Sequence, residues 1–345
     1  MPVRAADASD MSPTELRPTE WCTAPLDVTS MPLPTTTHNP SECVYSPRSG
    51  ATSFTGSADD RALLACEGAV QRNRSTAILP CSKTFVWHSL LCMPHFVLVA
   101  GAWLGSWAWD DVLDALGASG YEATAVTLSG LGDRRALPVD EVGQSTHVGD
   151  IVQVVEQANL QEVVLVGHSY AGVPVGQAAA HIRDRLRRVV YVDANIPTDG
   201  QSFIGGWSER GQQMTTQQIY DNRGYWPPLE AANYAGHDLS QEAISILVEH
   251  ATPHPGRTLT EPAHLLKPLS DLPSTYIKCL LAGEKPTEDV QALLDSDTWD
   301  LREVNTGHWP MFSTPTELAT LLIAVAEVQD IPWVGESAQP AEPAD

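Results

Sequence analysis

Two patterns of apolar and polar residues alternate along most of the chain after residue 95. Short, nearly continuous apolar runs predict strands, and segments with apolar residues every three or four positions predict helices. The predicted strands are residues 96–100, 122–128, 163–166, 188–192, 275–281 and 300–304. The predicted helices are residues 107–116, 145–158, 171–182, 290–294 and 315–328, the second of them capped by Ser145 or Thr146. This alternation is typical of an α/β protein whose parallel sheet is covered by helices on both faces.

Three parts of the chain fall outside this alternation. Residues 197–268 interrupt it and predict a helical cap between two strands. Residues 1–92 are rich in Pro, Thr and Ser without a sustained period, which predicts a largely disordered region. The change of character at Met93 leaves two interpretations of residues 1–92, a real extension or a mis-assigned start. We expect one α/β domain over residues 93–330, followed by an acidic tail over residues 331–345.

The amino-acid composition argues against several classes of binding partner and cofactor. Acidic residues number 43 against 20 basic ones, and the formal charge of −23 argues against nucleic acid and anionic membranes as partners. Six cysteines occur without a Cys-x-x-Cys pair, so we expect no metal site, no redox motif and no cofactor. We see no signal peptide and no apolar run of about 18 residues, and therefore expect a cytoplasmic protein. The sequence does not indicate an oligomeric state.

One predicted strand runs directly into a short polar turn. Residues 162–172 read EVVLVGHSYAG, which is almost the Gly-x-Ser-x-Gly elbow that presents a nucleophilic serine above a parallel sheet. Active groups in such sheets gather at the carboxyl ends of the strands. The fifth position of the motif is Ala171, and the next glycine, Gly172, comes one residue late. We interpret Ser169 as a nucleophile; the alternative is a serine that only caps the following helix.

A serine nucleophile needs a base to take its proton. His308 in VNTGHWPMF follows the last predicted strand and precedes the final helix, where this topology returns a loop to the elbow. We expect His168, which adjoins the serine, to pack inside the elbow. The histidines that fit a base less well, because they start elements or lie on helices or in the insert, are His95, His147, His181, His237, His250, His254 and His264.

The oxyanion of an ester-cleaving serine enzyme is usually held by two backbone amides. One candidate is the amide of Tyr170, directly after the nucleophile, and the other is the amide of Ala102, in the turn after the first predicted strand. Gly101 beside it also serves as a turn glycine, and both roles are compatible.

Four separated segments resemble the α/β-hydrolase superfamily, in this order: FVLVAGAWLGSWAWDDV, GHSYAG, VVYVDANIPTDGQSF and TGHWPMF. The resemblance covers about residues 93–330 and is strongest to the branch that contains methyl-salicylate-type esterases, hydroxynitrile lyases and small bacterial esterases. It implies an α/β-hydrolase fold, with a mostly parallel sheet and a helical cap. The first motif in that branch usually begins with a histidine, where this chain has Ala100.

The resemblance leaves two positions open for the acid that orients His308. Related esterases usually place an aspartate after the next-to-last strand, near Ala282 here, and Glu284 lies about two residues later. The superfamily's second location, after the strand that follows the nucleophile helix, holds Asp193. A carboxylate at the end of an apolar run requires a partner, and pairing with His308 would supply one. We favour Asp193 and keep Glu284 as the alternative. A further interpretation is that Asp193 only hydrogen-bonds loop amides near Asn195 and so shapes the turn.

The resemblance also separates the possible reactions. Hydroxynitrile lyases of this branch carry a threonine where this chain has Gly101, and a lysine where it has Trp309. Dehalogenases and epoxide hydrolases of the superfamily use an aspartate nucleophile instead of a serine. We therefore expect a serine carboxylesterase that cleaves a small uncharged ester or lactone through an acyl-enzyme. The alternatives are a non-hydrolytic lyase or cofactor-free oxygenase on the same scaffold, and a hydrolase-like receptor for a small ligand.

Aromatic residues near the motifs and in the insert suggest where such a substrate would bind. They either line an apolar pocket or form the insert's own core. The candidate pocket residues are Trp103, Trp207, Tyr225, Trp226 and Trp309.

Overall fold

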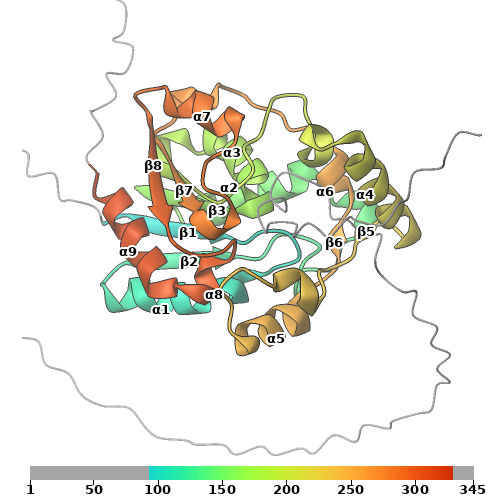
Figure 1. The fold of residues 1–345 in the computed structure, drawn as a ribbon. Coiled ribbons are helices and arrows are strands. Elements are labelled where there is room, and N and C mark those ends of the chain that lie inside the picture. Colours follow the sequence, from blue (N-terminus) through green and yellow to red (C-terminus); the bar gives the residue numbers. More distant parts are fainter. Residues whose placement is uncertain (1–92, 329–345) are drawn as a thin grey trace, which may run out of the picture. The chain divides into compact units, whose positions relative to one another are not determined.

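The computed structural model of the protein describes residues 93–328, and the predictions for residues 1–92 and 331–345 lie outside this range. Six strands in these residues form one sheet, and every neighbouring pair in it is parallel (Figure 1). The spatial order is β2-β1-β3-β4-β7-β8. The strands are β1 (His95–Val99), β2 (Glu122–Val126), β3 (Val163–His168), β4 (Leu186–Val192), β7 (Ser274–Cys279) and β8 (Trp299–Val304). The α/β-hydrolase fold class predicted from the sequence is confirmed.

Side chains on successive strand positions point to opposite faces, and the two faces build two separate cores. Val97 and Val99 of β1 belong to one core, and Phe96 and Leu98 to the other. The first core is covered by α2 (Gln144–Gln157), α3 (Gly172–His181) and α7 (Glu288–Leu294). The second is covered by α1 (Asp110–Ala118), α8 (Pro310–Ser313) and α9 (Pro315–Ala326). Both faces of the sheet are therefore closed, which explains the continuous apolar character of its strands.

Several element boundaries differ from the predicted ones. The second strand ends at Val126 instead of residue 128, and the hydroxyl of Thr127, directly after it, accepts a hydrogen bond from the amide of Ser106 at 2.9 Å. Residues 106–109 form a short 3-10 turn before α1 starts at Asp110. The third strand extends two residues further than predicted, to His168, directly before the candidate nucleophile.

The predicted cap of α2 is wrong. Gly143, in an extended conformation, is the N-cap, and neither Ser145 nor Thr146 takes that position. The hydroxyl of Thr146 accepts a hydrogen bond from the Gly143 amide at 3.2 Å, and the carboxylate of Glu261 accepts one from the Gln144 amide at 3.0 Å. A side chain more than a hundred residues away therefore completes the helix start, which local sequence cannot reveal.

The insert, defined as residues 197–268, connects β4 to β7. It contains α4 (Glu209–Asp221), α5 (Gln241–His250) and α6 (Arg257–Thr260). It also contains a two-stranded antiparallel sheet of β5 (Tyr225–Trp226) and β6 (His254–Pro255), which the prediction of a helical cap did not include. In Figure 1 these elements lie to one side of the main sheet. Insert residues contact the loops that follow β1 and β8, so the insert meets the sheet at the carboxyl ends of its strands.

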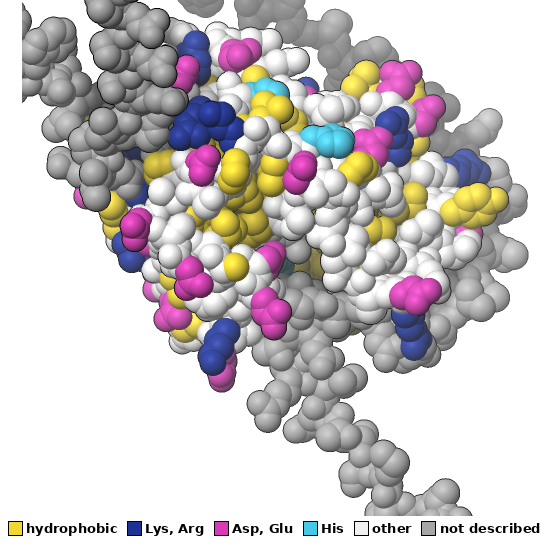
Figure 2. Space-filling view, turned by 90° about the horizontal axis from the view of Figure 1, so that it is seen from above, with side chains coloured by type: hydrophobic (Ala, Val, Ile, Leu, Met, Phe, Trp, Pro, Cys, Tyr) yellow, Lys and Arg dark blue, Asp and Glu magenta, His cyan; other side chains and the backbone are white. Residues whose placement is uncertain are grey.

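Charged side chains on the face seen in Figure 2 are interspersed, with acidic, basic and apolar groups next to one another. None of the helices between residues 93 and 328 is long and apolar enough to span a membrane.

Candidate active site

The turn after β3 places Ser169 in a strained backbone conformation. Its φ is +53°, in the left-handed region that non-glycine residues avoid at a cost of about 1–3 kcal/mol. A 3-10 turn over Ser169–Ala171 then leads into α3 at Gly172. This sharp strand–turn–helix geometry exposes a serine side chain above the sheet, as the elbow motif requires.

The displaced glycine of the motif has a steric explanation. A Cβ added to Gly172 would lie 2.2 Å from the carbonyl oxygen of Asn195, so only glycine fits there. Ala171, one residue earlier, is fully buried and keeps its methyl group within the core. The close approach of the neighbouring loop therefore falls at position 172, and the elbow forms with alanine at position 171.

His308 lies in the loop between β8 and α8 and reaches the serine. Its Nε2 accepts a hydrogen bond from the Ser169 hydroxyl at 2.9 Å. Its Nδ1 donates to Oδ2 of Asp193 at 2.6 Å, and this donation leaves Nε2 as the acceptor. Asp193 follows β4 and has a φ of +42°, so it too sits in a tight turn at a strand end. Three strand ends thus bring a hydroxyl, an imidazole and a carboxylate into one hydrogen-bonded chain.

The carboxylate of Asp193 has a second charged partner. Nζ of Lys278, on β7, lies 2.5 Å from its Oδ1, and both side chains are buried. Burial raises the pKa of Asp193, but the hydrogen bond and charge of His308 and the ammonium of Lys278 outweigh it and lower the pKa to about 2. The carboxylate therefore stays ionised near neutral pH and can stabilise a protonated His308.

Glu284 does not reach His308. It is exposed, beyond the short turn of Leu280–Ala282 that follows β7. The carbonyl of Ala282, close to where the resemblance places an acid, lies 3.4 Å from Nζ of Lys278. The structure thus brings Asp193 to His308 and leaves Glu284 at the surface.

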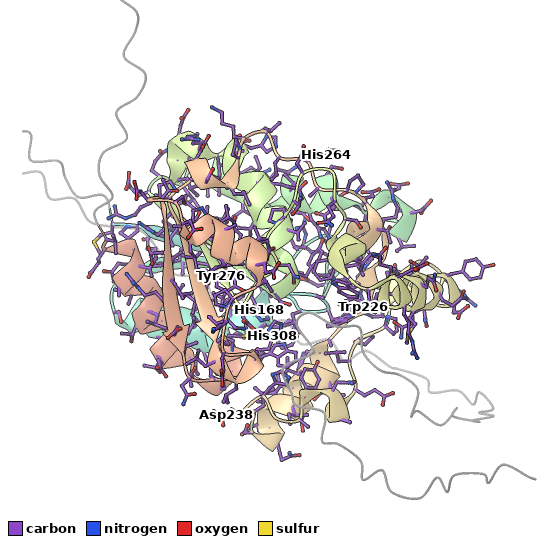
Figure 3. All side chains as sticks on the ribbon, turned by 45° about the horizontal axis from the view of Figure 1, so that its top comes forward. His168, Trp226, Asp238, His264, Tyr276 and His308 are labelled. Carbon is purple, nitrogen blue, oxygen red and sulfur yellow. The ribbon has the colours of Figure 1, made fainter. Side chains whose placement is uncertain are left out.

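His168 does more than the expected packing. Its ring is fully buried beside His308, with the ring centres 4.9 Å apart, and Figure 3 shows the two side by side. Its Nε2 donates a hydrogen bond to the carbonyl oxygen of His308 at 2.7 Å. Burial, followed by the charge of His308, lowers the pKa of His168 to about 3, so the ring is neutral. His168 therefore ties the loop of His308 to the elbow, a role that sequence reasoning missed.

The two amides proposed for the oxyanion lie on turns that touch each other. A Cβ on Gly101 would come within 2.8 Å of Cβ of Ser169, so the turn carrying Ala102 packs directly against the elbow carrying Tyr170. The side chain of Tyr170 points away into a buried polar cluster, where its hydroxyl donates to Nδ1 of His147 at 2.8 Å. That hydrogen bond fixes the residue behind the nucleophile.

The candidate pocket residues divide into two groups. Trp103 packs on Trp226 with ring centres 4.2 Å apart, and Trp207 contacts Trp226 at 6.1 Å. Tyr225 precedes Trp226 on β5 and pairs with Pro255 of β6. Trp309 lies apart from them, against His308, with ring centres 5.0 Å apart. In Figure 3, Trp226 lies apart from His308.

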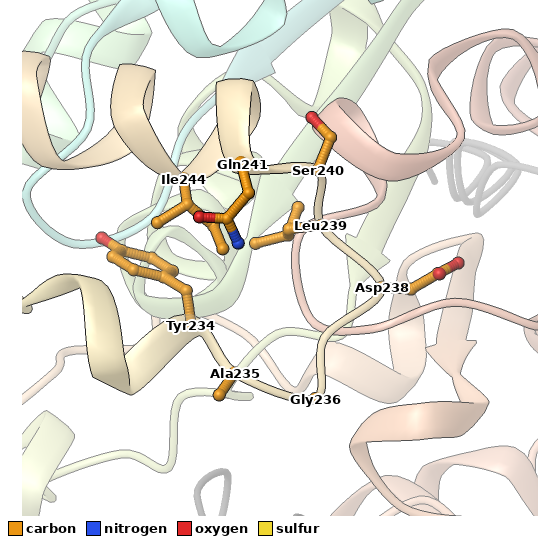
Figure 4. A pocket seen from close by; sticks show the side chains of 8 residues that line it. All are labelled: Tyr234, Ala235, Gly236, Asp238, Leu239, Ser240, Gln241 and Ile244. Atoms are coloured by element: carbon orange, nitrogen blue, oxygen red, sulfur yellow. The ribbon is translucent and has the colours of Figure 1, made fainter.

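A pocket of about 590 Å³ opens elsewhere on the insert, lined by residues 234–236, 238–241 and 244 (Figure 4). It contains none of the predicted pocket residues. Within residues 93–328, no three His, Cys, Asp or Glu side chains are grouped so that they could hold a metal ion.

Comparison with known proteins identifies the family. The profile of the alpha/beta hydrolase family matches residues 96–321. Methylesterase 8 of Arabidopsis thaliana is 36% identical over 68% of this chain and 89% of its own length. A carbendazim hydrolyzing esterase of Nocardioides is 38% identical over 32% of this chain and 46% of its own length. An extracellular alpha/beta-hydrolase of a Paenibacillus species shares the fold, with a TM-score of 0.59 and 21% identity over 67% of this chain and 98% of its own. The protein belongs to the alpha/beta hydrolase family.

Proposed function

We propose that this protein is a serine carboxylesterase that cleaves a small, uncharged carboxylic ester through an acyl-enzyme. The observation that carries the proposal is the hydrogen-bonded chain from Ser169 through His308 to Asp193. The names of its relatives, an esterase and a methylesterase, support ester hydrolysis as the reaction type.

The proposed reaction begins when His308 takes the Ser169 proton and the serine oxygen attacks the ester carbonyl carbon. The amides of Ala102 and Tyr170 donate hydrogen bonds to the oxyanion. The bond to the alcohol breaks as His308 returns the proton to the alcohol oxygen, which leaves an acyl group on Ser169. His308 then deprotonates a water molecule that attacks this acyl group, and the serine leaves with the proton. Asp193 holds the imidazole in the required tautomer throughout.

The surroundings of the serine favour hydrolysis over the lyase reaction. A side chain at Gly101 would meet both Cβ of Ser169 at 2.8 Å and Nδ1 of His168 at 2.9 Å. The threonine that hydroxynitrile lyases carry at this position would not fit without movement of the elbow. Trp309, where those lyases carry a cation, is packed against Tyr234 and His237.

The test is turnover of p-nitrophenyl acetate and butyrate by the wild type and by Ser169→Ala. We expect the variant to lose about 10³-fold or more in kcat/KM. The acyl-enzyme itself would appear as an acyl mass on an active-site peptide containing Ser169 after rapid acid quench. Equal turnover by wild type and variant, with both proteins folded, would contradict the proposal. The cytoplasmic location stays a prediction.

A further inference from the structure

Two histidines of the insert contact the loops that carry the proposed reacting groups. His237 lies between α4 and α5, and His254 begins β6. Both side chains are almost completely buried, at 2% and 0% exposure. Each accepts a hydrogen bond from a backbone amide on the sheet side, and each amide belongs to a loop at the candidate active site.

His254 accepts the bond from the loop after β1. Its Nδ1 lies 3.2 Å from the amide nitrogen of Trp103, the residue after the proposed oxyanion donor Ala102. Its Nε2 donates to the hydroxyl of Thr258 at 2.9 Å, and that hydroxyl donates to the carbonyl of Pro255 at 2.6 Å. This chain of donors fixes the ring as the tautomer with a free lone pair at Nδ1.

The hydrogen bond from Trp103 to His254 stabilises a strained backbone conformation. The φ of Trp103 is +67°, so the turn that follows Ala102 must be held by its surroundings. The residue that usually begins this motif in the resembling branch is a histidine, and Ala100 has no side chain that could hold the turn. In this chain the imidazole of His254, which belongs to the insert, bonds the backbone of the turn in place of that histidine.

His237 accepts the bond from the loop after β8. Its Nδ1 lies 3.2 Å from the amide nitrogen of His308. The backbone fits closely there, because a Cβ added to Gly307 would lie 2.2 Å from the carbonyl oxygen of His237. The carbonyl of His308 is held at the same time by His168. The backbone of His308 is therefore held from both sides, by the elbow and by the insert.

Both rings can serve as acceptors only while they are neutral. Burial, followed by the charge of His308, lowers the pKa of His237 to about 4. Burial, followed by the charge of His147, lowers the pKa of His254 well below its ordinary value. Near neutral pH each ring is therefore neutral, and the amide donor beside its Nδ1 identifies Nδ1 as the nitrogen that carries the lone pair.

We propose that His237 and His254 are positioning residues, whose Nδ1 lone pairs fix the backbone of His308 and of the Ala102–Trp103 turn in their reactive arrangement. The proposal rests on the proposed esterase function and extends it to the insert. Under this proposal the insert contributes to the catalytic geometry. Small displacements of reacting groups are costly, since about 1 Å can reduce a rate by about 10²-fold.

Substitution by two amides of different length tests the acceptor directly. The side-chain oxygen of Asn occupies the place of Nδ1, whereas the longer Gln carries its oxygen one bond further, near Nε2. We expect His237→Asn and His254→Asn to keep kcat within about 3-fold, and His237→Gln, His254→Gln and the corresponding Leu variants to lower kcat by about 10²-fold with little change in KM. His181→Asn, an exposed position at the end of α3, is the matched control.

Two kinetic outcomes would overturn the proposal. One is kcat within about 2-fold of the wild type in all of these variants, and the other is an equal loss in the Asn, Gln and Leu variants. The second outcome would mean that the rings only fill space.

Amide hydrogen exchange, measured by NMR in the Ser169→Ala background, tests the hydrogen bonds without any activity. We expect the amides of His308 and Trp103 to stay protected in the Asn variants and to exchange faster in the Gln and Leu variants. Unchanged protection in all variants would overturn the proposal. Absence of Ser169-dependent turnover in the wild type would instead contradict the esterase function, and the exchange experiment would still decide the role of the two histidines.

Discussion

The sheet and the insert contribute to the candidate active site in different ways. The sheet supplies side chains, because Ser169, His308 and Asp193 each follow the carboxyl end of a strand. The insert supplies acceptors for backbone amides, through His237 and His254. The candidate reacting groups therefore follow from the strand order, whereas the backbone contacts around them also involve a segment that belongs to no strand of the main sheet.

The largest expected effect separates the two possible acids of the sheet region. Asp193→Asn should lower kcat by about 10⁴-fold, because the amide favours the wrong tautomer of His308. Glu284→Gln, at an exposed position, should leave kcat within about 2-fold of the wild type, as surface substitutions remote from a site usually do. Steady-state hydrolysis of p-nitrophenyl acetate measures both. A larger loss from Glu284→Gln than from Asp193→Asn would reverse the assignment.

The second prediction compares how much a buried ion pair at the sheet and a more exposed ion pair in the insert contribute to stability. Lys278→Met leaves the buried carboxylate of Asp193 without its ammonium, and we expect a loss of about 3–5 kcal/mol in the free energy of unfolding. Arg257→Met breaks the pair with Glu261, in which the arginine side chain is half-exposed, and should cost about 1 kcal/mol or less. Urea unfolding provides both values. Equal losses in the free energy of unfolding would show that the buried ion pair stabilises the fold no more than the exposed one.

The elbow offers a comparison between two adjacent positions. Gly172→Ala forces a methyl group against the carbonyl of Asn195, and should cost about 1–3 kcal/mol of stability. Ala171→Gly restores the usual glycine of the motif and should cost less than about 1 kcal/mol, through added backbone freedom. Thermal unfolding of the two variants measures the difference. The reverse order of stabilities would refute the steric account of the displaced glycine.

The smallest expected effect is on how the free energy of unfolding changes at acid pH, through His237 of the insert. The pKa of His237 falls from 6.5 to about 4 on folding, so the unfolded chain binds more protons between these pH values and stability decreases as the pH falls from 6.5 toward 4. The groups that face this ring are His308, whose charge lowers its pKa, and Asp193, whose charge raises it. His237→Asn should reduce the slope by up to about 1.4 kcal/mol per pH unit. Urea unfolding of the wild type and His237→Asn at pH 4.5 and 6.5 measures how the free energy of unfolding depends on pH. The same dependence in both proteins would contradict the prediction.

The parts of the site that sequence could predict share one property. Ser169 and His308 follow apolar strands in an α/β alternation, and the position of each strand end fixes the edge of the sheet at which the side chain lies. The sequence favours Asp193 over Glu284 because a carboxylate at the end of an apolar run needs a partner. The inferences for Ser169 and His308 use local pattern and chain order, whereas the two candidate positions of the acid come from the family resemblance.

The remaining parts depend on contacts between distant positions. His254 bonds a residue 151 positions away and His237 one 71 positions away, and nothing in the local sequence of the insert indicates either partner. The sequence predicts Lys278 only as part of a strand, and its partner Asp193 follows another strand, 85 positions earlier. The one available signal was the placement of polar residues in apolar surroundings, since such groups require partners when buried. That signal indicates a partner without identifying it.

The contacts of His237 and His254 also bear on how the substrate range of such a protein can diverge. Trp207 and Trp226 precede His237, and α5 lies between His237 and His254. Exchange of either stretch leaves both imidazoles in place, provided that Trp226, which packs on Trp103, and Thr252, whose amide donates to the Trp103 carbonyl, are kept. Transplanting a whole insert from a relative replaces both imidazoles at once. We expect such chimaeras to fold and bind ligand, yet to turn over slowly until a histidine or asparagine is restored at each position.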